Sequence, residues 1–497
     1  MAEAHIRIWP ELAGARINPN IYGHFAEYLG RCVYEGIWVG PRSRIPNQDG
    51  IRLDVLAALK QLRAPVIRWP GGCFADNYHW RDGIGPAENR PQTVNIWWQQ
   101  VEPNTFGTDE FIALCRAIGC SPYICVNVGS GSVEEAREWV EYCNFGGDSA
   151  LAQLRADNGN AQPYNVKYWG IGNENWGCGG NFAPDDYARE FIRYATYIHA
   201  TDPGVETIAC GCSPGDYSNE KHVRWNHDLC QAAAGSSLMD HLSIHRYFKR
   251  GHGAQFNDAE YNALFGDLLA MESDIQQADR LLAYFFPDRF VGLVIDEWGV
   301  WHPAAVVDNG LEQENTLRDA VFAGAALNLF NNYAHRVTMA NIAQTINVLQ
   351  CLAFTSKSDM VLTPTYYVYD MMRPHMGGRS IKNESDLPTF ETHPVGFSKK
   401  RSVPALSIST SLSGKRIRLT VANQTVDQPV ETAIEVREAD IASVSGRVLA
   451  TDSPRDMNTF EDPKVVTPKR LKADYEKGEL VHTFPPHSFT ALTITLG

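Results

Sequence analysis

Eight short apolar runs, separated by segments with helical patterning, constrain the fold of this chain more than any other feature. The runs cover residues 21–29, 65–72, 121–129, 165–174, 205–211, 240–248, 292–301 and 335–343. Strands that alternate with helices along a chain form parallel sheets. Eight such repeats in roughly 350 residues therefore predict an α/β fold, a closed (β/α)8 TIM barrel with long loops.

Helix signals between the runs support this interpretation. Ser132 and Glu135 form a capping box ahead of an apolar helical face. Thr108 can cap another helix, and Gly119 can end it. The alternative is an open, doubly wound sheet, which usually carries a glycine-rich phosphate loop after its first strand. The stretch GHFAEYLG is not such a loop.

The pattern changes after residue 375, where apolar and polar residues begin to alternate. Residues 406–412 and 417–421 alternate on either side of a Ser-Gly turn, which predicts a hairpin. Residues 5–9 alternate as well. We therefore predict two domains: a catalytic barrel over residues 18–374, and a jelly-roll-like all-β sandwich built from residues 1–17 and 375–497, which includes the N-terminal strand.

Charge and hydropathy exclude several partners. The formal net charge is −14 and the isoelectric point is about 5.5, whereas nucleic acids and anionic membranes require a basic surface. No apolar stretch is long enough to span a membrane, and the N-terminus lacks the basic and apolar regions of a secretory signal. We expect a cytoplasmic enzyme that acts on a neutral substrate and binds neither nucleic acid nor membrane.

The 11 cysteines are scattered and do not show the paired C-x-x-C spacing of zinc sites. We expect most of them to be small buried hydrophobic residues kept reduced in the cytoplasm. The sequence therefore predicts no metal site.

Carboxylates, amides and aromatic residues gather at the ends of the predicted strands, where barrel enzymes hold their reactive groups. In chain order these residues are Glu27, Arg68, Asn173, Glu174, His245, Tyr247, Glu297 and Trp301. Glycoside hydrolysis requires two carboxyl groups, one that protonates the leaving oxygen and one that attacks the anomeric carbon or activates water. Glu174 and Glu297 follow the fourth and seventh strands, so they can face each other across the barrel mouth.

Six segments in this order resemble glycoside hydrolase family 51, the retaining α-L-arabinofuranosidases. They are GHFAEYLGRCVYEGIW, RWPGGCFADNYHWRDGIGP, KYWGIGNEN, SIHRYF, DEWGVW and NIAQTINVLQ. The likeness spans nearly the whole chain. It implies exo-acting release of α-L-arabinofuranosyl units from arabinan, arabinoxylan or their oligosaccharides. It also implies that the enzyme needs no cofactor or metal and forms a homo-oligomer, commonly a hexamer.

The resemblance implies a role for each matching residue. Glu174 would be the general acid/base and Glu297 the nucleophile, with Arg68 steadying Glu297 and His245 supporting Glu174. The residues around the arabinofuranosyl ring would be Glu27, Cys73, Asn173, Tyr247 and Gln350, with Trp98 and Trp301 lining the pocket. The chain departs from the family at Gly299, where asparagine is more common, and in residues 73–77, and both departures affect the expected leaving-group preference.

Some of these residues have a competing interpretation. Glu27 could be the structural partner of an arginine, Cys73 could contact the sugar through its backbone alone, and His245 could be a core histidine. Asp296 is expected to be structural and to face the helices, and Gln344 to be a polar filler.

Two alternative functions remain open. The same mechanism could act on β-xylosides or, in an endo mode, on β-glucans. A protein of a different class, a non-catalytic carbohydrate-binding barrel, is disfavoured because both carboxylates are retained.

Overall fold

The computed structural model describes the whole chain except residues 1, 214–219, 396–398, 472, 474 and 477–478. Eight parallel strands form a closed barrel, and each lies within one of the eight apolar runs, so the predicted (β/α)8 barrel is confirmed. The strands are β2 (Gly23–Phe25), β5 (Val66–Trp69), β8 (Ser121–Val126), β9 (Tyr168–Ile171), β10 (Glu206–Ala209), β11 (His241–Phe248), β12 (Gly292–Val300) and β13 (Val337–Ala343).

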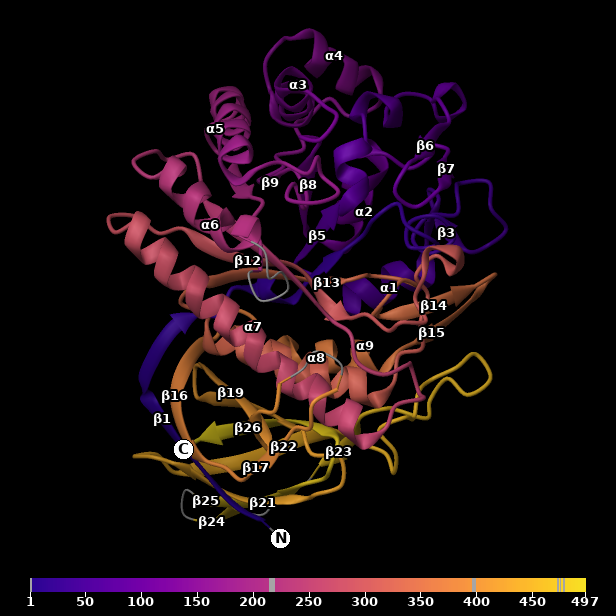
Figure 1. Cartoon of the computed structure of the whole chain (residues 1–497). Coiled ribbons are helices and arrows are strands. Elements are labelled where there is room, and N and C mark those ends of the chain that lie inside the picture. Colours follow the sequence, from indigo (N-terminus) through magenta and orange to yellow (C-terminus); the bar gives the residue numbers. More distant parts are fainter. Residues whose placement is uncertain (1, 214–219, 396–398, 472, 474, 477–478) are drawn as a thin grey trace.

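Helices surround the barrel (Figure 1). They are α1 (Leu53–Leu62), α2 (Thr108–Ile118), α3 (Val133–Asn144), α4 (Ala150–Asp157), α5 (Pro184–Thr201), α6 (Glu220–Ala233), α7 (Asp258–Phe285), α8 (Leu317–Asn332) and α9 (Pro364–Met372). As predicted, Ser132 caps α3 by accepting the Glu135 N–H at 3.1 Å. Thr108 lies inside α2 instead of capping it, because its buried hydroxyl accepts the Trp139 indole N–H at 3.1 Å.

Shorter elements fill the loops. The 3-10 turns are η1 (Pro19–Tyr22), η2 (Cys73–Asn77), η3 (Trp80–Gly83), η4 (Ala87–Asn89), η6 (Val307–Asn309) and η7 (Arg373–His375). The two-stranded pairs are β3 (Asn47–Gln48) with β4 (Ile51–Arg52), β6 (Thr93–Asn95) with β7 (Gln100–Glu102), β14 (Ala353–Ser356) with β15 (Asp359–Leu362), and β17 (Thr389–Glu391) with β18 (Ser402–Pro404). None of the helices that the structure describes has the length and apolar character needed to cross a bilayer.

The second domain is a ten-stranded sheet that contains both chain ends (Figure 1). Its strands are β1 (Ala2–Arg16), β16 (Arg379–Asp386), β19 (Leu406–Ser413), β20 (Arg416–Asn423), β21 (Val430–Val436), β22 (Ile441–Leu449), β23 (Lys469–Leu471), β24 (Tyr475–Glu476), β25 (Glu479–Phe484) and β26 (Ser488–Leu496). The predicted hairpin is β19–β20, and the N-terminal strand β1 pairs with β16 and β21 as expected.

The strands of the predicted sandwich all belong to one continuous sheet. Residues from both halves of the strand order, including Ile6, Leu419, Ile434 and Ile494, share one buried apolar cluster. A sheet can place both halves against one core only by folding back on itself. The sandwich-like core is therefore enclosed by a single folded sheet.

Helix α8 joins the two domains. It contacts β13 of the barrel on one side and strands β19, β20 and β26 of the sheet on the other, so it is buried along almost its whole length. Asn328 donates to the Ser407 carbonyl at 2.9 Å and accepts from Thr420 Oγ1 at 2.7 Å. These contacts hold the sheet against the barrel.

Candidate active site

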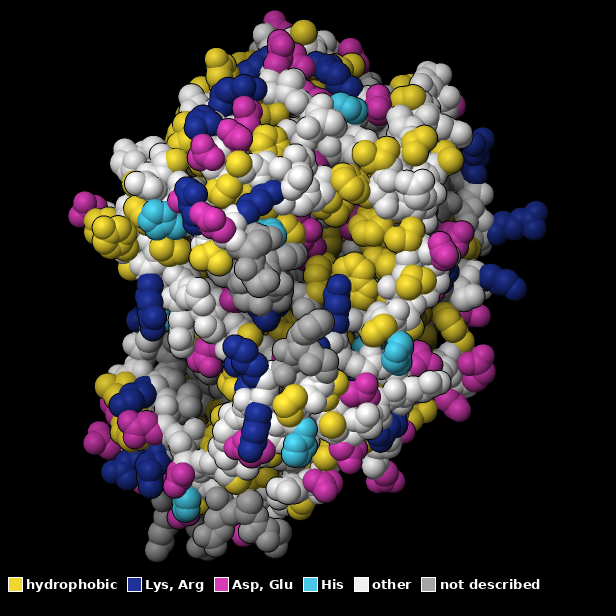
Figure 2. Space-filling model, in the orientation of Figure 1, with side chains coloured by type: hydrophobic (Ala, Val, Ile, Leu, Met, Phe, Trp, Pro, Cys, Tyr) yellow, Lys and Arg dark blue, Asp and Glu magenta, His cyan; other side chains and the backbone are white. Residues whose placement is uncertain are grey.

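A cavity of about 790 Å³ opens at the C-terminal ends of the barrel strands. Most of the predicted site residues line it, namely Glu27, Cys73, Trp98, Glu174, His245, Tyr247, Glu297 and Trp301. Figure 2 shows this face of the molecule hollowed, with hydrophobic side chains on the visible wall. The predicted placement of reactive groups at this end of the barrel is thus observed.

The two candidate catalytic carboxyl groups face each other beside His245. His245 Nδ1 lies 3.0 Å from Glu174 Oε1 and 3.5 Å from Glu297 Oε1. One oxygen of each carboxyl group and one His245 nitrogen all lie within 4.8 Å of one another. Both carboxyl groups can therefore act on the same bond of one bound molecule.

The charges around His245 keep its imidazole protonated. Burial alone would lower its pKa, but Glu297, Asp296 and Glu174 outweigh burial and raise the pKa of His245 to about 10. The His245 side chain is therefore a cation at neutral pH. This geometry favours the predicted supporting role over that of a neutral core histidine.

Two donors hold the Glu297 carboxylate. Arg68 Nη1 lies 2.8 Å from Oε1, and the Tyr247 hydroxyl donates to Oε2 at 2.7 Å. Arg68 is fully buried and also donates to Asn173 Oδ1 at 2.6 Å. Burial would lower the pKa of Arg68, but Asp296 and Glu297 raise it well above its usual value. The arginine therefore fixes both the carboxylate and the amide next to Glu174.

The expectation that Asp296 faces the helices is wrong. Its carboxylate accepts from Tyr123 at 2.8 Å and from Asn341 at 3.1 Å, and it lies 3.3 Å from Arg68 Nε inside the barrel. The reason is an irregularity in β12, whose pairing with β11 shifts register so that Asp296 is an extra residue. A bulge of this kind lets two consecutive side chains point to the same side of a strand.

Glu27 is held by N–H donors, and the alternative of a direct arginine partner is not observed. Its Oε1 accepts from the Phe74 backbone at 3.1 Å and from the Trp98 indole at 2.8 Å, and its Oε2 accepts from Gln344 at 3.1 Å. Burial, with a contribution from Glu297, raises the pKa of Glu27 to about 7. Gln344 thus lies in the cavity wall and is more than a filler.

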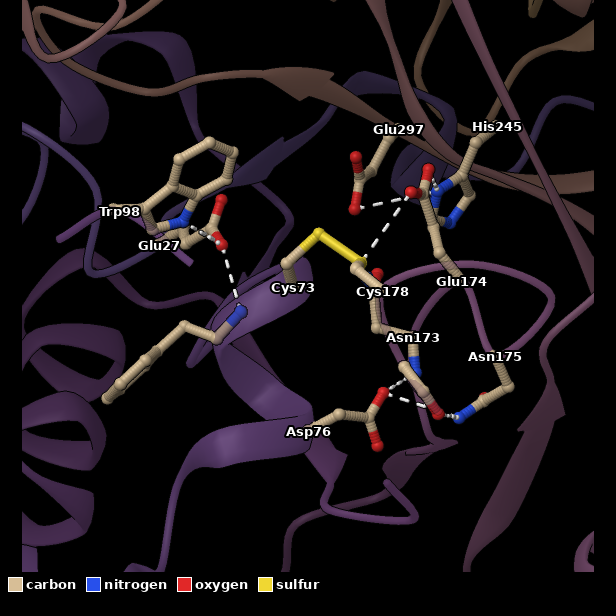
Figure 3. Close-up of a disulfide and its surroundings, with 12 residues drawn as sticks. Glu27, Cys73, Asp76, Trp98, Asn173, Glu174, Asn175, Cys178, His245 and Glu297 are labelled. Carbon is tan, nitrogen blue, oxygen red and sulfur yellow. Dashed lines mark hydrogen bonds and ion pairs between the residues drawn. A yellow bond between two sulfur atoms is a disulfide. The ribbon is translucent and has the colours of Figure 1, made fainter. Parts of the chain in front are cut away.

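Asp76 organises the turn that carries Glu174, and sequence reasoning missed it. Its Oδ2 accepts the Asn173 N–H at 2.7 Å (Figure 3). Its Oδ1 accepts the N–H groups of Val128 and Gly129, each at 2.7 Å. Burial raises the pKa of Asp76 to about 7. These bonds hold a turn in which Glu174 adopts the left-handed region, with φ of 42°. The only signal in the sequence was a carboxylate in the loop that follows the glycine pair.

Cys73 and Cys178 form a disulfide, so the expectation of reduced thiols is wrong for these two residues. The bond joins η2 to the loop after β9, and Cys178 Sγ lies 3.8 Å from Glu174 Oε2 (Figure 3). The other nine cysteines are free, and all but the half-buried Cys120 are buried, as predicted. The disulfide forms part of the cavity wall next to the candidate acid/base.

Three predicted residues do not line the cavity. Arg68 and Asn173 lie beneath its wall and act through Glu297 and Glu174. The Gln350 amide accepts from Val300 N–H and donates to the Asp319 carbonyl, so the structure does not bring it to the cavity.

Glu174, His245 and Glu297 are also spaced closely enough to hold a metal ion. Both oxygens of Glu297 already accept hydrogen bonds, and Arg68 places a fixed positive charge next to them. Since that charge repels a cation, we assign the three side chains to acid/base and nucleophilic chemistry.

Known proteins match this arrangement along the whole chain. Residues 58–258 match the family model described as alpha-L-arabinofuranosidase 1 domain, and residues 296–488 match the alpha-L-arabinofuranosidase C-terminal domain. The intracellular exo-alpha-L-arabinofuranosidase of Bacteroides ovatus is 40% identical over 97% of this chain and 94% of its own length. The chain belongs to the α-L-arabinofuranosidases of glycoside hydrolase family 51.

Other relatives of this arabinofuranosidase support the same family assignment. Alpha-L-arabinofuranosidase C of Emericella nidulans is 34% identical over 98% of this chain and 96% of its own. The crystal structure of the family 51 arabinofuranosidase from Xanthomonas axonopodis pv. citri superposes with a TM-score of 0.93 at 34% identity and covers 100% of both chains. The Thermotoga maritima enzyme in its arabinose complex gives a TM-score of 0.86 at 34% identity, covering 99% of this chain and 100% of that one.

The chain is thus a glycoside hydrolase with arabinofuranosidase activity, and the non-catalytic alternative is not supported. A bifunctional glucanase-xylanase from a metagenome library has a TM-score of 0.63 at 14% identity and covers 100% of both chains. At that identity the likeness shows a shared fold only.

Proposed function

We propose that this arabinofuranosidase is an exo-acting, retaining enzyme that releases α-L-arabinofuranosyl units from arabinan, arabinoxylan or derived oligosaccharides. The observation that carries the proposal is the approach of Glu174 and Glu297 oxygens to within 4.8 Å in one cavity. Retaining glycosidases hold their carboxyl groups about 5–5.5 Å apart, whereas inverting enzymes leave about 6.5–9.5 Å for a water molecule.

In the first step, Glu297 attacks the anomeric carbon while Glu174 donates a proton to the leaving oxygen. Arg68 and Tyr247 orient the Glu297 carboxylate for attack. In the second step, Glu174 takes a proton from water, the water oxygen attacks the anomeric carbon, and Glu297 leaves as a carboxylate.

The positive charge of His245 supports the first step. It stabilises the carboxylate that Glu174 becomes after it has donated its proton, because His245 Nδ1 lies 3.0 Å from Glu174 Oε1. Glu27, Trp98 and Gln344 form one wall of the glycone site, with an acceptor and an amide for hydroxyl groups and an indole for the C–H face.

The proposed location is the cytoplasm, and the proposed assembly is a hexamer. The first is supported by the printed name of the Bacteroides relative. The assembly rests on the family resemblance, and light scattering of the purified protein tests it. A mass of one chain would overturn the hexamer without affecting the mechanism.

Trapping with a 2-fluoro arabinofuranosyl inactivator tests the nucleophile. We expect the label on the peptide that carries Glu297, and a label on any other carboxylate would overturn the assignment.

Glu174→Ala should slow hydrolysis of substrates with poor leaving groups by roughly 10²–10⁴-fold, but affect nitrophenyl arabinofuranoside much less. Azide should partly restore the rate of that variant. Equal losses for both kinds of substrate would contradict the acid role.

The β-xylosidase and endo-β-glucanase alternatives keep the same mechanism and differ in substrate. Rates on nitrophenyl arabinofuranoside, nitrophenyl xyloside and a soluble β-glucan separate them. We expect the arabinofuranoside to be the best substrate, with single arabinose units as the product.

A further inference from the structure

The cavity continues well beyond the catalytic carboxylates. From Tyr247 the cavity follows the end of β11 to Lys249 and Arg250 and then runs along α7. It ends at Lys399 and Arg401, which precede strand β18 in the chain. Volumes of several hundred cubic ångström accommodate ligands larger than one pentose ring. The outer part of this cavity is therefore available to the sugars from which arabinose is cleaved.

Basic side chains dominate this outer part. Its charged residues are Arg246, Lys249, Arg250, Asp267, Asp274, Lys399 and Arg401. Two ion pairs use both of the acidic residues: Arg246 with Asp274 at 2.5 Å, and Arg250 with Asp267 at 2.8 Å. Within the described part of the chain, Lys249, Lys399 and Arg401 form no ion pair. Figure 2 shows Lys and Arg side chains beside the hollow.

Lys249 lines the cavity next to the aromatic residues of the candidate active site. Its Nζ is 4.5 Å from the centroid of the Trp301 ring, which itself lies 5.2 Å from the Tyr247 ring. Tyr247 in turn donates to the nucleophile Glu297 at 2.7 Å. The ammonium group is thus connected to Glu297 through two successive aromatic rings.

Arg401 provides a second unused donor. Its Nε is buried, and among the residues that the structure describes it has no hydrogen-bond partner. Arg401 also lines the cavity, so its guanidinium can meet an acceptor from a bound ligand. A guanidinium pairs well with a carboxylate, because two parallel N–H groups match two oxygens.

We propose that Lys249, Lys399 and Arg401, named here the basic wall, form an aglycone subsite for the carboxylate of an acidic sugar. The inference rests on the proposed exo mode and extends it. The arabinofuranosyl unit is neutral, so the acidic sugar would belong to the oligosaccharide that leaves. The net charge of −14 describes the whole molecule and disfavours acidic ligands in general. At the basic wall the local charge is positive, so an acidic leaving group can bind there.

The test compares two substrates that differ in one group. One is an arabinofuranosyl oligosaccharide with a uronic acid in its aglycone, and the other is the same compound after reduction of the carboxyl to a primary alcohol. For the unmodified enzyme at low salt, we expect kcat/KM to be roughly tenfold higher for the acid, and this preference to shrink as salt is added.

Two substitutions and a matched control locate the effect. Lys249→Gln and Arg401→Gln should each lower the acid-to-neutral ratio by about two- to fivefold. Lys400→Gln removes the same charge from a neighbouring residue that pairs with Glu391 and does not line the cavity, so it should leave the ratio unchanged. Circular dichroism of each variant confirms that it is folded.

An acid-to-neutral ratio of kcat/KM near one in the unmodified enzyme would overturn the proposal. A fall of this ratio in the Lys400→Gln control as large as in Lys249→Gln or Arg401→Gln would overturn it as well. These outcomes are distinct from failure of the proposed function. Nitrophenyl arabinofuranoside has no carboxylate, so its hydrolysis and the labelling of Glu297 report on the retaining mechanism alone.

Discussion

Asp76 shows how much of this active site depends on a residue that does not touch the cavity. Its two oxygens accept three backbone N–H groups, from Asn173, Val128 and Gly129. A carboxylate accepts at both oxygens, whereas an amide accepts at one and donates at the other. The residue therefore joins the ends of β8 and β9 in the geometry that Glu174 requires.

Asp76→Asn should impair both stability and catalysis. The new amide would leave at least one buried backbone N–H without an acceptor, which costs about 1–3 kcal/mol in the free energy of unfolding. Since the turn positions Glu174, kcat/KM should fall more for poor leaving groups than for nitrophenyl arabinofuranoside. Urea unfolding and paired kinetics check this. The exposed Asp157→Asn serves as the control, and equal kinetic losses for all leaving groups would contradict the positioning role.

Glu27 makes a pH-dependent contribution to stability. Its pKa rises from 4.5 to about 7 on folding, so between these values the folded protein holds a proton that the unfolded chain has released. The unfolding free energy contributed by this group therefore decreases as the pH rises from about 4.5 to 7.

In Glu27→Gln this contribution is absent. The stability of the unmodified enzyme relative to the variant should therefore fall by about 1–3 kcal/mol between pH 4.5 and 7. Urea unfolding at several pH values measures the difference. Parallel curves for the two proteins would show that the Glu27 pKa is the same in the folded and unfolded states.

At the scale of elements, two loops form one unit through the Cys73–Cys178 disulfide. The bond links η2 to the loop after β9, and these segments are separated by 105 residues in sequence. It also places a sulfur atom 3.8 Å from Glu174. The disulfide therefore adds a covalent link to the Asp76 hydrogen bond that already joins these two loops.

Breaking this disulfide should lower both the stability of the fold and the rate of the step that needs proton donation by Glu174. A cross-link that closes a loop of about 100 residues contributes up to about 4–5 kcal/mol by restricting the unfolded chain. We expect dithiothreitol to lower the melting temperature and the rate on poor leaving groups. The double variant Cys73→Ala/Cys178→Ala should show the same deficits and no longer respond to dithiothreitol.

Cys120→Ala is the matched control, because this thiol is free and half-buried. It should respond to dithiothreitol as the unmodified enzyme does. An unmodified enzyme whose melting temperature and activity are insensitive to full reduction, verified by thiol titration, would contradict the prediction.

At the scale of the whole molecule, helix α8 makes the barrel and the sheet one cooperative structure. Gly324 lies so close to the sheet that a Cβ atom added there would meet the Phe489 ring at 2.4 Å. The helix thus approaches β26 at a position where no side chain fits. Helix α9 adds contacts to β22 and β26, but α8 makes the larger interface with the sheet.

Gly324→Val should destabilise the protein by about 1–3 kcal/mol through overpacking. Since α8 contacts both domains, we expect calorimetry to show one unfolding transition shifted to lower temperature. Arabinofuranosidase activity at 25 °C should be nearly unchanged, because Gly324 is not part of the cavity. A transition that splits in two, with only the sheet destabilised, would contradict the cooperative role of α8.

Local sequence patterns were sufficient for the eight barrel strands, the β19–β20 hairpin and the N-terminal strand of the sheet. The carboxylates Glu174 and Glu297 were predicted correctly to lie together because the C-terminal ends of barrel strands meet at one face, independently of the loop conformations. The inward Asp296 was missed because the bulge in β12 breaks the alternation from which orientation is predicted.

What the sequence by itself determined is therefore the fold, the family and the two carboxylates, since these follow from periodicity and from contiguous motifs. Only the tertiary structure decided the Cys73–Cys178 bond, the three N–H groups on Asp76 and the basic wall beyond Tyr247. Each of these joins segments far apart in the chain. Such contacts depend on how loops pack in three dimensions, which periodicity along one strand or helix does not encode.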